Sequence, residues 1–364
     1  MHPSKPSTHP NHIPALDGLR GIAIIMVLLW HYLPASQSFF PGWTGVDLFF
    51  VLSGYLITWR LLATKDQPNF FSRFYRNRIL RIFPLYYTLV IGFLLAIHFL
   101  VQPKNLPTFD TYTDHWKSFL IFTENWTFMW HPLPRDLSLG PLWSIAVEEQ
   151  FYLIWPAIIL LLPGKRSRIT VFGCLILIVL LARTITYLTH PSYPRLYYNT
   201  FFRMDSFVIG ALLYQLHEAR IKTSPNLVAW ITLGLLAILL FNNLSLKNPL
   251  PGDPFMMTAG YTILALFFAC LLQLATSPKS NMFSVFLSGK ILRGTGKISY
   301  CLYLVHFPVL QIVSSRFHSY GLNTWPGHGT LLTILSITTA LTLSLLISII
   351  SFRYFESFFL ALKK

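Results

Sequence analysis

Long apolar stretches dominate this sequence from beginning to end. Runs of about 20 predominantly apolar residues recur along it, and that is the length at which a helix crosses a bilayer. The pattern predicts an all-α polytopic integral membrane protein with ten transmembrane helices. The predicted spans cover residues 14–33, 44–62, 83–101, 142–162, 169–189, 201–217, 226–243, 256–276, 298–316 and 330–352.

The charges between these spans predict an orientation. If the N-terminus is cytoplasmic, the inside segments hold 18 lysines and arginines and the outside segments hold 5. Positive residues concentrate on the cytoplasmic side, so the asymmetry favours an even number of spans with both termini cytoplasmic. The outside segment 102–141 is the longest. Its stretch 116–130 is of marginal length for a span, and we expect an interfacial or re-entrant helix there.

Composition narrows the class of protein. Hydrophobic residues make up 54% and charged residues only 11%, about half the charge of a soluble domain. The net charge of +15 could indicate nucleic-acid binding, but the basic residues lie in short segments between the predicted spans. We predict a disordered cytoplasmic tail over 1–13, a transmembrane domain over 14–357 and a short basic cytoplasmic tail over 358–364. The three cysteines lie in apolar runs and indicate no metal site or disulfide.

The first predicted span carries polar residues on one face. Arg20 and His31 are eleven residues apart, about three helical turns, so they share a face about 16 Å apart along the axis. Asp17 lies one turn before Arg20. Polar groups inside a membrane are costly and are usually functional. The alternative is an arginine at the membrane surface and a histidine satisfied inside the bundle.

The second predicted span contains a face of small and polar residues. Asp47, Gly54 and Thr58 recur at helical spacing, with Ser53 beside them. Gly54 and Ser53 could belong to a site or could allow close helix packing. Asp47 is near the outer end and could be solvated.

The fourth predicted span carries Ser144, Glu148 and Tyr152 at i, i+4 and i+8, on one face of an otherwise apolar helix. A carboxylate facing lipid is costly, so we expect Glu148 to face the bundle interior. Glu149 lies about 100° away and is expected near the surface.

Further polar residues occur in three other stretches. In the inside loop 70–87, Arg78 and Arg81 form a pair suited to phosphate, or alternatively to lipid headgroups or to orientation alone. In the stretch 297–308, residues at i, i+4 and i+7 share a face and could bind substrate or serve packing; they are Ser299, Tyr303 and His306. We expect a structural ion pair between Asp205 and either Arg183 or Arg203.

Five segments in order, LDGLRGIAIIMVLLWH, GVDLFFVLSGYLIT, RNRILRIFP, LWSIAVEEQFYLIWP and ISYCLYLVHFP, resemble the membrane-bound acyltransferase-3 family. That family O-acylates O-antigens, other surface polysaccharides, nodulation factors and macrolides. The resemblance covers about 13–357. Arg20 and His31 match its motif of a basic residue, ten residues and a histidine, and Arg78 and Arg81 match its R-x-x-R motif. Many members carry an extracytoplasmic SGNH hydrolase-like domain, and we expect any second transfer step here to need a separate protein.

The resemblance implies an O-acetyltransferase of the bacterial inner membrane that moves an acyl group from cytosolic acyl-CoA to a hydroxyl of a surface or lipid-linked polysaccharide, such as lipopolysaccharide. Acyl-CoA would be a co-substrate, with no permanently bound cofactor. Arg78 and Arg81 would meet its phosphates, and His31 would act as general base or form an acyl-histidine. Arg20 would hold the donor or Asp17, and the oxyanion donor stays unnamed. The other residues expected to bind substrate or acyl-CoA are Asp17, Ser53, Glu148, Tyr152, Tyr303 and His306.

Other functions remain open. The acceptor could be a small molecule such as a macrolide. A transporter or exporter of a small anion or glycan could use the same polar path, although no internal repeat supports a transporter of the inverted-repeat type. A non-catalytic scaffold would not need a buried histidine and glutamate.

Overall fold

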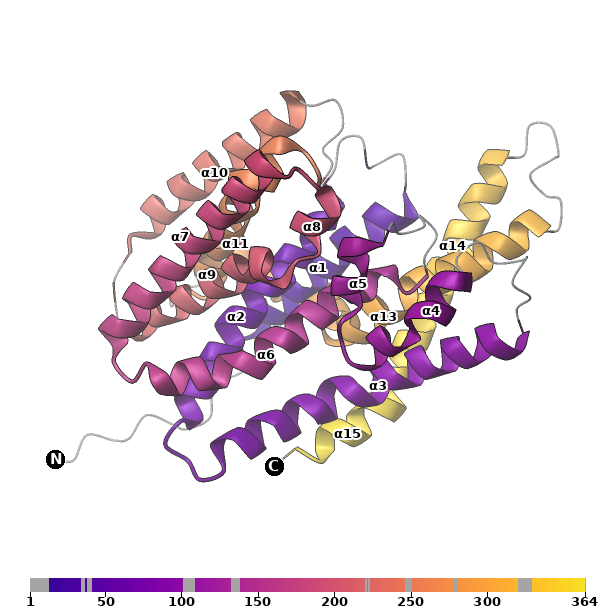
Figure 1. Cartoon of the computed structure of the whole chain (residues 1–364), viewed down its shortest axis with the longest axis horizontal. Helices are drawn as coiled ribbons and strands as arrows, with labels where there is room; N and C mark the ends of the chain where they lie inside the picture. The colour runs from indigo at the N-terminus through magenta and orange to yellow at the C-terminus, as the bar shows by residue number, and fades with distance from the viewer. Residues whose placement is uncertain are drawn as a thin grey trace.

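A computed structural model describes residues 13–33, 37, 41–100, 109–131, 138–219, 221, 223–245, 251–277, 281–319 and 329–363. Within these ranges every regular element is a helix, which confirms the predicted all-α class (Figure 1). The predicted tail over 1–13 lies outside the described residues except for Ile13.

Nine helices among the described residues are long and apolar enough to cross a membrane. They are built on α1 (Pro14–Tyr32), α2 (Gly45–Thr64), α3 (Phe70–Leu100), α6 (Trp143–Leu161), α7 (Lys165–Thr189), α10 (Pro225–Ser245), α11 (Tyr261–Ala275), α13 (Lys290–Ser319) and α14 (Gly329–Ile350). They coincide with nine predicted spans. The remaining predicted span, 201–217, coincides with α9 (Thr200–Glu218), which is not among the nine. The number ten and the orientation stay predictions.

The shorter α-helices are α4 (Phe109–Leu120), α5 (Glu124–Trp130), α8 (Tyr193–Tyr197), α12 (Met282–Leu287) and α15 (Ser357–Ala361). Two 3-10 helices, Gly42–Thr44 and Gly140–Leu142, and two π-helical turns, Met256–Gly260 and Ser351–Glu356, adjoin the longer helices. The stretch 116–130 is divided between α4 and α5, with Phe122 at a φ of 55° between them. Neither helix is long enough to cross a bilayer, so the prediction that this stretch is not a span is confirmed.

The long helices pack around α1 and α2 (Figure 1). Helix α1 lies between α2 and α13, α2 packs on α9, and α10 covers α11 from outside. Several contacts between helices depend on glycine, and two of them are examples. A Cβ atom on Gly296 of α13 would overlap the carbonyl oxygen of Asp17, and one on Gly54 of α2 would overlap that of Phe207. The close-packing alternative for Gly54 therefore holds.

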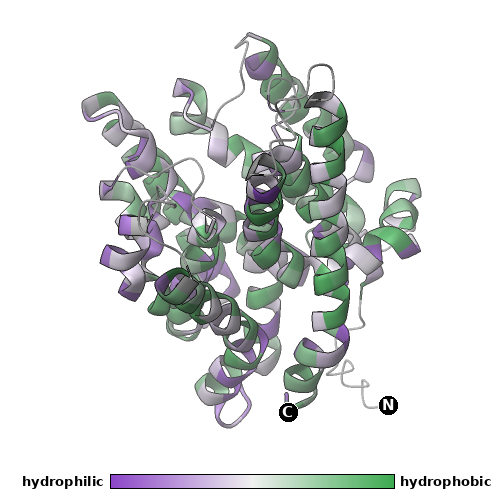
Figure 2. Ribbon diagram, turned by 90° about the vertical axis from the view of Figure 1, so that its right-hand side faces the viewer, coloured by the Kyte–Doolittle hydropathy of each residue, from purple (hydrophilic) through white to green (hydrophobic). Residues whose placement is uncertain are grey.

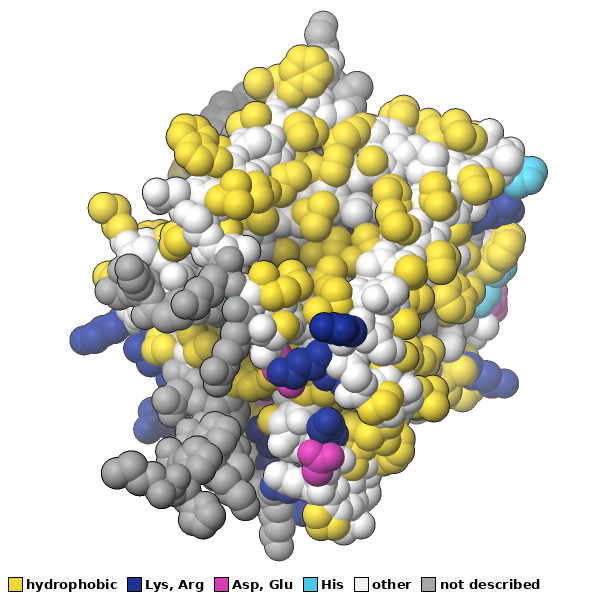
Figure 3. Space-filling model, turned by 90° about the vertical axis from the view of Figure 1, so that its left-hand side faces the viewer, with side chains coloured by type: hydrophobic (Ala, Val, Ile, Leu, Met, Phe, Trp, Pro, Cys, Tyr) yellow, Lys and Arg dark blue, Asp and Glu magenta, His cyan; other side chains and the backbone are white. Residues whose placement is uncertain are grey.

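The outside of the bundle is apolar. Hydrophobic residues cover most of the length of the long helices (Figure 2). Large side chains such as Leu161, Phe241 and Ile291 are more than 70% exposed. In the view of Figure 3, lysines and arginines gather mostly in the lower half, at the height at which the C-terminus lies in Figure 1. An apolar belt with basic residues toward one end is the surface expected of a membrane-spanning protein.

Helix α3 shows that one sequence-based prediction is wrong. Residues 70–82, predicted as part of an inside loop, form the first turns of one continuous helix that runs to Leu100. Polar contacts fasten this part of α3 to the bundle. Tyr75 donates a hydrogen bond to the carbonyl of Leu153 at 2.8 Å, and Tyr300 donates to that of Ile82 at 2.8 Å. The arginines of α3 are therefore held at fixed helical positions.

Candidate active site

Two cavities lie in series inside the bundle. The basic cavity, of about 350 Å³, is bounded by α1, α2, α3 and the C-terminal end of the chain. The polar cavity, of about 120 Å³, lies between α1, α2, α3, α6 and α13. Arg20, Leu56, Arg78 and Arg81 line both. The two spaces therefore meet at a junction of three guanidinium groups.

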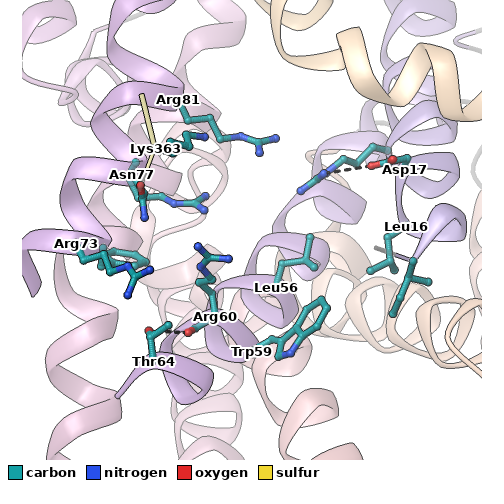
Figure 4. A pocket seen from close by; sticks show the side chains of 14 residues that line it. Leu16, Asp17, Leu56, Trp59, Arg60, Thr64, Arg73, Asn77, Arg81 and Lys363 are labelled. Carbon is teal, nitrogen blue, oxygen red and sulfur yellow. Dashed lines mark hydrogen bonds and ion pairs between the residues drawn. The ribbon is translucent and has the colours of Figure 1, made fainter. Parts of the chain in front are cut away.

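Cations dominate the lining of the basic cavity. Figure 4 shows side chains from α2 and α3 and the C-terminal end pointing into the same space, with Asp17 on the opposite side. The lining cations are Arg20, Arg60, Arg73, Arg78, Arg81 and Lys363. Asp17 is the one carboxylate among the lining residues, and it lies 3.6 Å from Arg20. The cavity therefore carries a net positive charge suited to an anion.

The positive charge of the basic cavity affects the titration of Lys363, the next-to-last residue. Burial and, in decreasing order of effect, the charges of Arg81, Arg78 and Arg60 together lower the pKa of Lys363 to about 7. Loss of hydration is the largest cause, and the neighbouring arginines, which face one carboxylate in the cavity lining, add to it. The predicted tail over 358–364 thus contains helix α15 as far as Ala361, and it places a cation in the basic cavity.

The polar cavity contains the face predicted on the fourth span. Ser144, Glu148 and Tyr152 all line it, so Glu148 faces the bundle interior as expected. The hydroxyl of Ser53 donates to Oε1 of Glu148 at 2.6 Å, and Tyr152 donates to the Ser53 oxygen at 3.1 Å. Glu149, expected near the surface, is half-buried with its Oε1 atom enclosed.

The guanidinium of Arg78 is positioned by rings. It lies 5.8 Å from the ring centre of Phe74 and 5.6 Å from that of Tyr152, distances at which a cation is attracted to the ring face. Its buried Nε atom has no hydrogen-bond partner among the described residues. Arg78 is therefore held in place at the junction, and its Nε–H group can donate a hydrogen bond to a ligand.

His31 meets His306 at the opposite end of α1 from Arg20. The distance from Nε2 of His306 to Nδ1 of His31 is 3.2 Å, and the ring centres are 5.0 Å apart. His306 is fully buried, whereas His31 is half-buried. Neither histidine lines the basic or the polar cavity. Arg20 therefore lines both cavities and His31 lines neither, which agrees with their separation of about 16 Å along α1.

Tyr303 lies between the polar cavity and the histidine pair. It lines the cavity, and its hydroxyl donates to the carbonyl of Pro141 at 2.9 Å and is hydrogen-bonded to Ser144 at 2.6 Å. Its own carbonyl is 2.7 Å from Nδ1 of His306. One turn of α13 thus connects the cavity wall to the histidines.

A third group of polar residues, which we call the ion-pair cluster, comprises Asp47, Arg183, Arg203 and Asp205. Arg203 donates to Asp47 at 2.6 Å and Arg183 to Asp205 at 2.9 Å, all with fully buried side chains. The predicted pair with Asp205 is confirmed for Arg183. The alternative that Asp47 is solvated does not hold, because α9 brings Arg203 against it.

Several residues of the two cavities were not predicted from the sequence. Arg60 lies seven residues after Ser53 on α2, and this helical spacing was a usable signal. Lys363 gave no such signal, since a charged residue near a chain end is expected in solvent. Ser299 and Tyr303 line the polar cavity as their spacing suggested, whereas His306 turns to His31.

A helical bundle that joins a basic cavity to a buried polar one, with paired histidines beyond, fits an enzyme that handles an anionic donor. The family model for the acyltransferase domain matches residues 13–353. The chain therefore belongs to the acyltransferase-3 family.

Curated relatives are similar over most of this chain. The peptidoglycan O-acetyltransferase OatA of Listeria monocytogenes is 30% identical over 95% of this chain and 55% of its own length. The putative peptidoglycan O-acetyltransferase YrhL of Bacillus subtilis is 31% identical over 84% of this chain and 49% of its own. The O-acetyltransferase OatA of Staphylococcus aureus is 27% identical over 85% and 52%. The chain spans about half the length of these relatives. No solved structure matches it significantly.

Proposed function

We propose that this chain is a membrane O-acetyltransferase that moves an acetyl group from cytosolic acetyl-CoA to a hydroxyl of a cell-wall or surface polysaccharide. Family membership and the names of the relatives support the acyl-transfer chemistry. The bacterial cytoplasmic membrane as its location, and acyl-CoA as a co-substrate without a permanently bound cofactor, are parts of the same proposal.

One observation carries the choice of donor. Six cations converge on the basic cavity, and three of them continue into the polar cavity. Coenzyme A carries its phosphates at one end and its thioester at the other, joined by a flexible pantetheine arm. Forked guanidinium donors bind phosphate oxygens bidentately, so Arg78 and Arg81 would hold the phosphates. The arm would pass Arg20 into the polar cavity.

The proposed reaction is an attack of the acceptor hydroxyl on the thioester carbonyl. His31 takes the hydroxyl proton, the oxygen–carbon bond forms, and the carbon–sulfur bond then breaks. The leaving thiolate recovers the proton from the imidazolium. An acyl-histidine intermediate at His31 is the alternative course. On this proposal the thioester passes Tyr303 to reach His31, so the Tyr303–Ser144 contact has to open during the cycle.

The relatives favour one class of acceptor. The names of the Listeria monocytogenes and Bacillus subtilis relatives specify peptidoglycan, so we propose a cell-wall glycan first, ahead of lipopolysaccharide or a macrolide. Whichever acceptor is used, Ser53, Glu148 and Tyr152 would line the path of the pantetheine arm through the polar cavity.

The test is acetyl transfer by the protein in nanodiscs, with radiolabelled acetyl-CoA, a peptidoglycan fragment as acceptor, and measurement of thiol release. We expect label in the glycan and loss of transfer by about 100- to 10,000-fold in His31→Ala, because a general base contributes about that much. His98→Ala, which removes an exposed histidine of α3, is the matched control and should keep full activity. Full transfer by folded His31→Ala would remove His31 from the mechanism.

The same labelled substrates, offered to the protein in proteoliposomes, separate an enzyme from a transporter. A transporter would move a labelled solute across proteoliposomes and return it chemically unchanged. Flux of intact acetyl-CoA or glycan without any acetylated product would contradict the proposed function.

A further inference from the structure

The histidine pair has a hydrogen-bond geometry that fixes which nitrogen carries each proton. Nδ1 of His306 faces the carbonyl of Tyr303 at 2.7 Å, and Nδ1 of His31 faces that of Val27 at 3.0 Å. A carbonyl accepts but cannot donate, so both Nδ1 atoms carry hydrogen when the rings are neutral. Nε2 of His306 is then a bare acceptor.

That acceptor is aimed at His31. The distance of 3.2 Å from Nε2 of His306 to Nδ1 of His31 lets the Nδ1–H of His31 bond to both the Val27 carbonyl and His306. The lone pair of His31 is consequently left on Nε2. Nδ1 of His31 carries the hydrogen and is bonded to the protein, whereas Nε2 of His31 is free to take a proton from a substrate.

The backbone of His306 is anchored as well. Tyr32, the neighbour of His31, donates a hydrogen bond to the carbonyl of His306 at 2.9 Å and shares another with Ser344 at 2.9 Å. The ring of Phe307 packs on His31 with centres 4.9 Å apart. The His31 ring therefore lies between an acceptor and an aromatic wall.

We propose that His306 is a positioning residue that holds His31 in the tautomer protonated at Nδ1, with Nε2 as the proton acceptor. The proposal rests on the proposed acyl transfer. During that reaction the acceptor hydroxyl gives its proton to Nε2 of His31. The Nδ1–H bond to His306 becomes charge-assisted and stronger, and the proton then leaves to the thiolate. His306 itself neither gains nor loses a proton.

Substitutions of His306 separate this role from packing. His306→Leu removes the acceptor at similar volume and should lower kcat on the order of 100-fold, with KM for acetyl-CoA changed less than twofold, because loss of the orienting partner of a catalytic histidine acts on turnover. His306→Gln can place its amide oxygen where Nε2 of His306 lies, as an acceptor for the Nδ1–H of His31. This variant should recover at least tenfold of the lost kcat. Val313→Ala, which removes buried apolar volume two turns further along α13, is the packing control and should change kcat less than threefold.

The tautomer itself is measured by solid-state nitrogen-15 NMR of histidine-labelled protein in lipid, with His31 assigned by the difference from His31→Gln. We expect the wild-type His31 signal to show protonation at Nδ1. In His306→Leu the Val27 carbonyl still accepts from Nδ1, so we expect a larger fraction of the form protonated at Nε2 rather than a complete change of tautomer. A wild-type ring protonated at Nε2, or unchanged kcat in His306→Leu, would overturn the proposal. If the wild-type protein shows no acetyl transfer but its His31 is protonated at Nδ1, the proposed function is overturned and the arrangement of the histidine pair is supported.

Discussion

The ion-pair cluster and the basic cavity use the same residue types inside one bundle with opposite results. In the cluster each arginine has a carboxylate, Arg203 with Asp47 at 2.6 Å and Arg183 with Asp205 at 2.9 Å. In the basic cavity six cations face one carboxylate. Buried charges are costly unless paired, and each arginine of the cluster has its carboxylate, although Nε and Nη1 of Arg203 and Oδ2 of Asp47 have no hydrogen-bond partner among the described residues. The cations of the basic cavity are half-buried or exposed and outnumber its carboxylate, so the cavity can accept an anion.

Aromatic rings complete the environment of the cluster. The guanidinium of Arg203 lies 3.9 Å from the ring centre of Tyr261 and 5.2 Å from that of Tyr197. Phe50 packs within 5.8 Å of the same guanidinium and also lines the polar cavity. One side chain of α2 thus separates the charges that serve folding from those we assign to substrate. Stability and donor affinity should therefore be lost by different substitutions.

The largest expected effect is on stability, at the cluster. Arg203→Ala leaves Asp47 buried without its partner and should lower the free energy of unfolding by about 3–5 kcal/mol. Asp47→Leu combined with Arg203→Met removes both charges and should recover most of the loss. Thermal unfolding in detergent, followed by tryptophan fluorescence, measures both. A single variant as stable as the wild type would contradict the assignment of this pair to folding.

The next effect is on donor affinity, at the basic cavity. Arg78→Ala with Arg81→Ala should raise KM for acetyl-CoA at least tenfold and leave KM for the glycan and the melting temperature nearly unchanged, because each charge-assisted bond to phosphate contributes about 1.5–3 kcal/mol. Arg166→Ala removes an exposed cation of α7 and is the control. An unchanged KM for the thioester would show that the pair serves membrane orientation instead.

The smallest effect is a pH dependence at Lys363. Because its pKa is lowered to about 7, the side chain is charged below that pH and neutral above it. KM for acetyl-CoA should therefore rise a few-fold between pH 6 and pH 8. Lys363→Arg keeps the charge over this range and should flatten the profile. A wild-type profile as flat as that of the arginine variant would place the donor phosphates away from the chain end.

Sequence spacing predicted the parts of the site that lie on single helices. Ser144, Glu148 and Tyr152 share the cavity face that i, i+4, i+8 spacing implies, and Asp17 pairs with Arg20. The register of one helix is fixed by its period, so these groupings need no tertiary information.

Helical spacing cannot predict contacts between residues that are distant in the sequence. His31 and His306 are 275 positions apart, and Asp47 and Arg203 are 156 apart. Their meeting depends on how α1 packs on α13 and α2 on α9, which no periodicity specifies. The helical start of α3 was missed because Arg73, Arg76, Arg78 and Arg81 suggest a solvated loop, whereas contacts to α6 and α13 hold the segment in the helix.

The central claim is that the basic cavity and the polar cavity together hold an acyl-CoA donor. A cryo-EM structure of the wild-type chain in nanodiscs with coenzyme A tests it most directly. We predict phosphate density beside Arg78 and Arg81 and a pantetheine arm that passes Arg20 into the polar cavity. Coenzyme A bound elsewhere, with both cavities empty, would contradict the account.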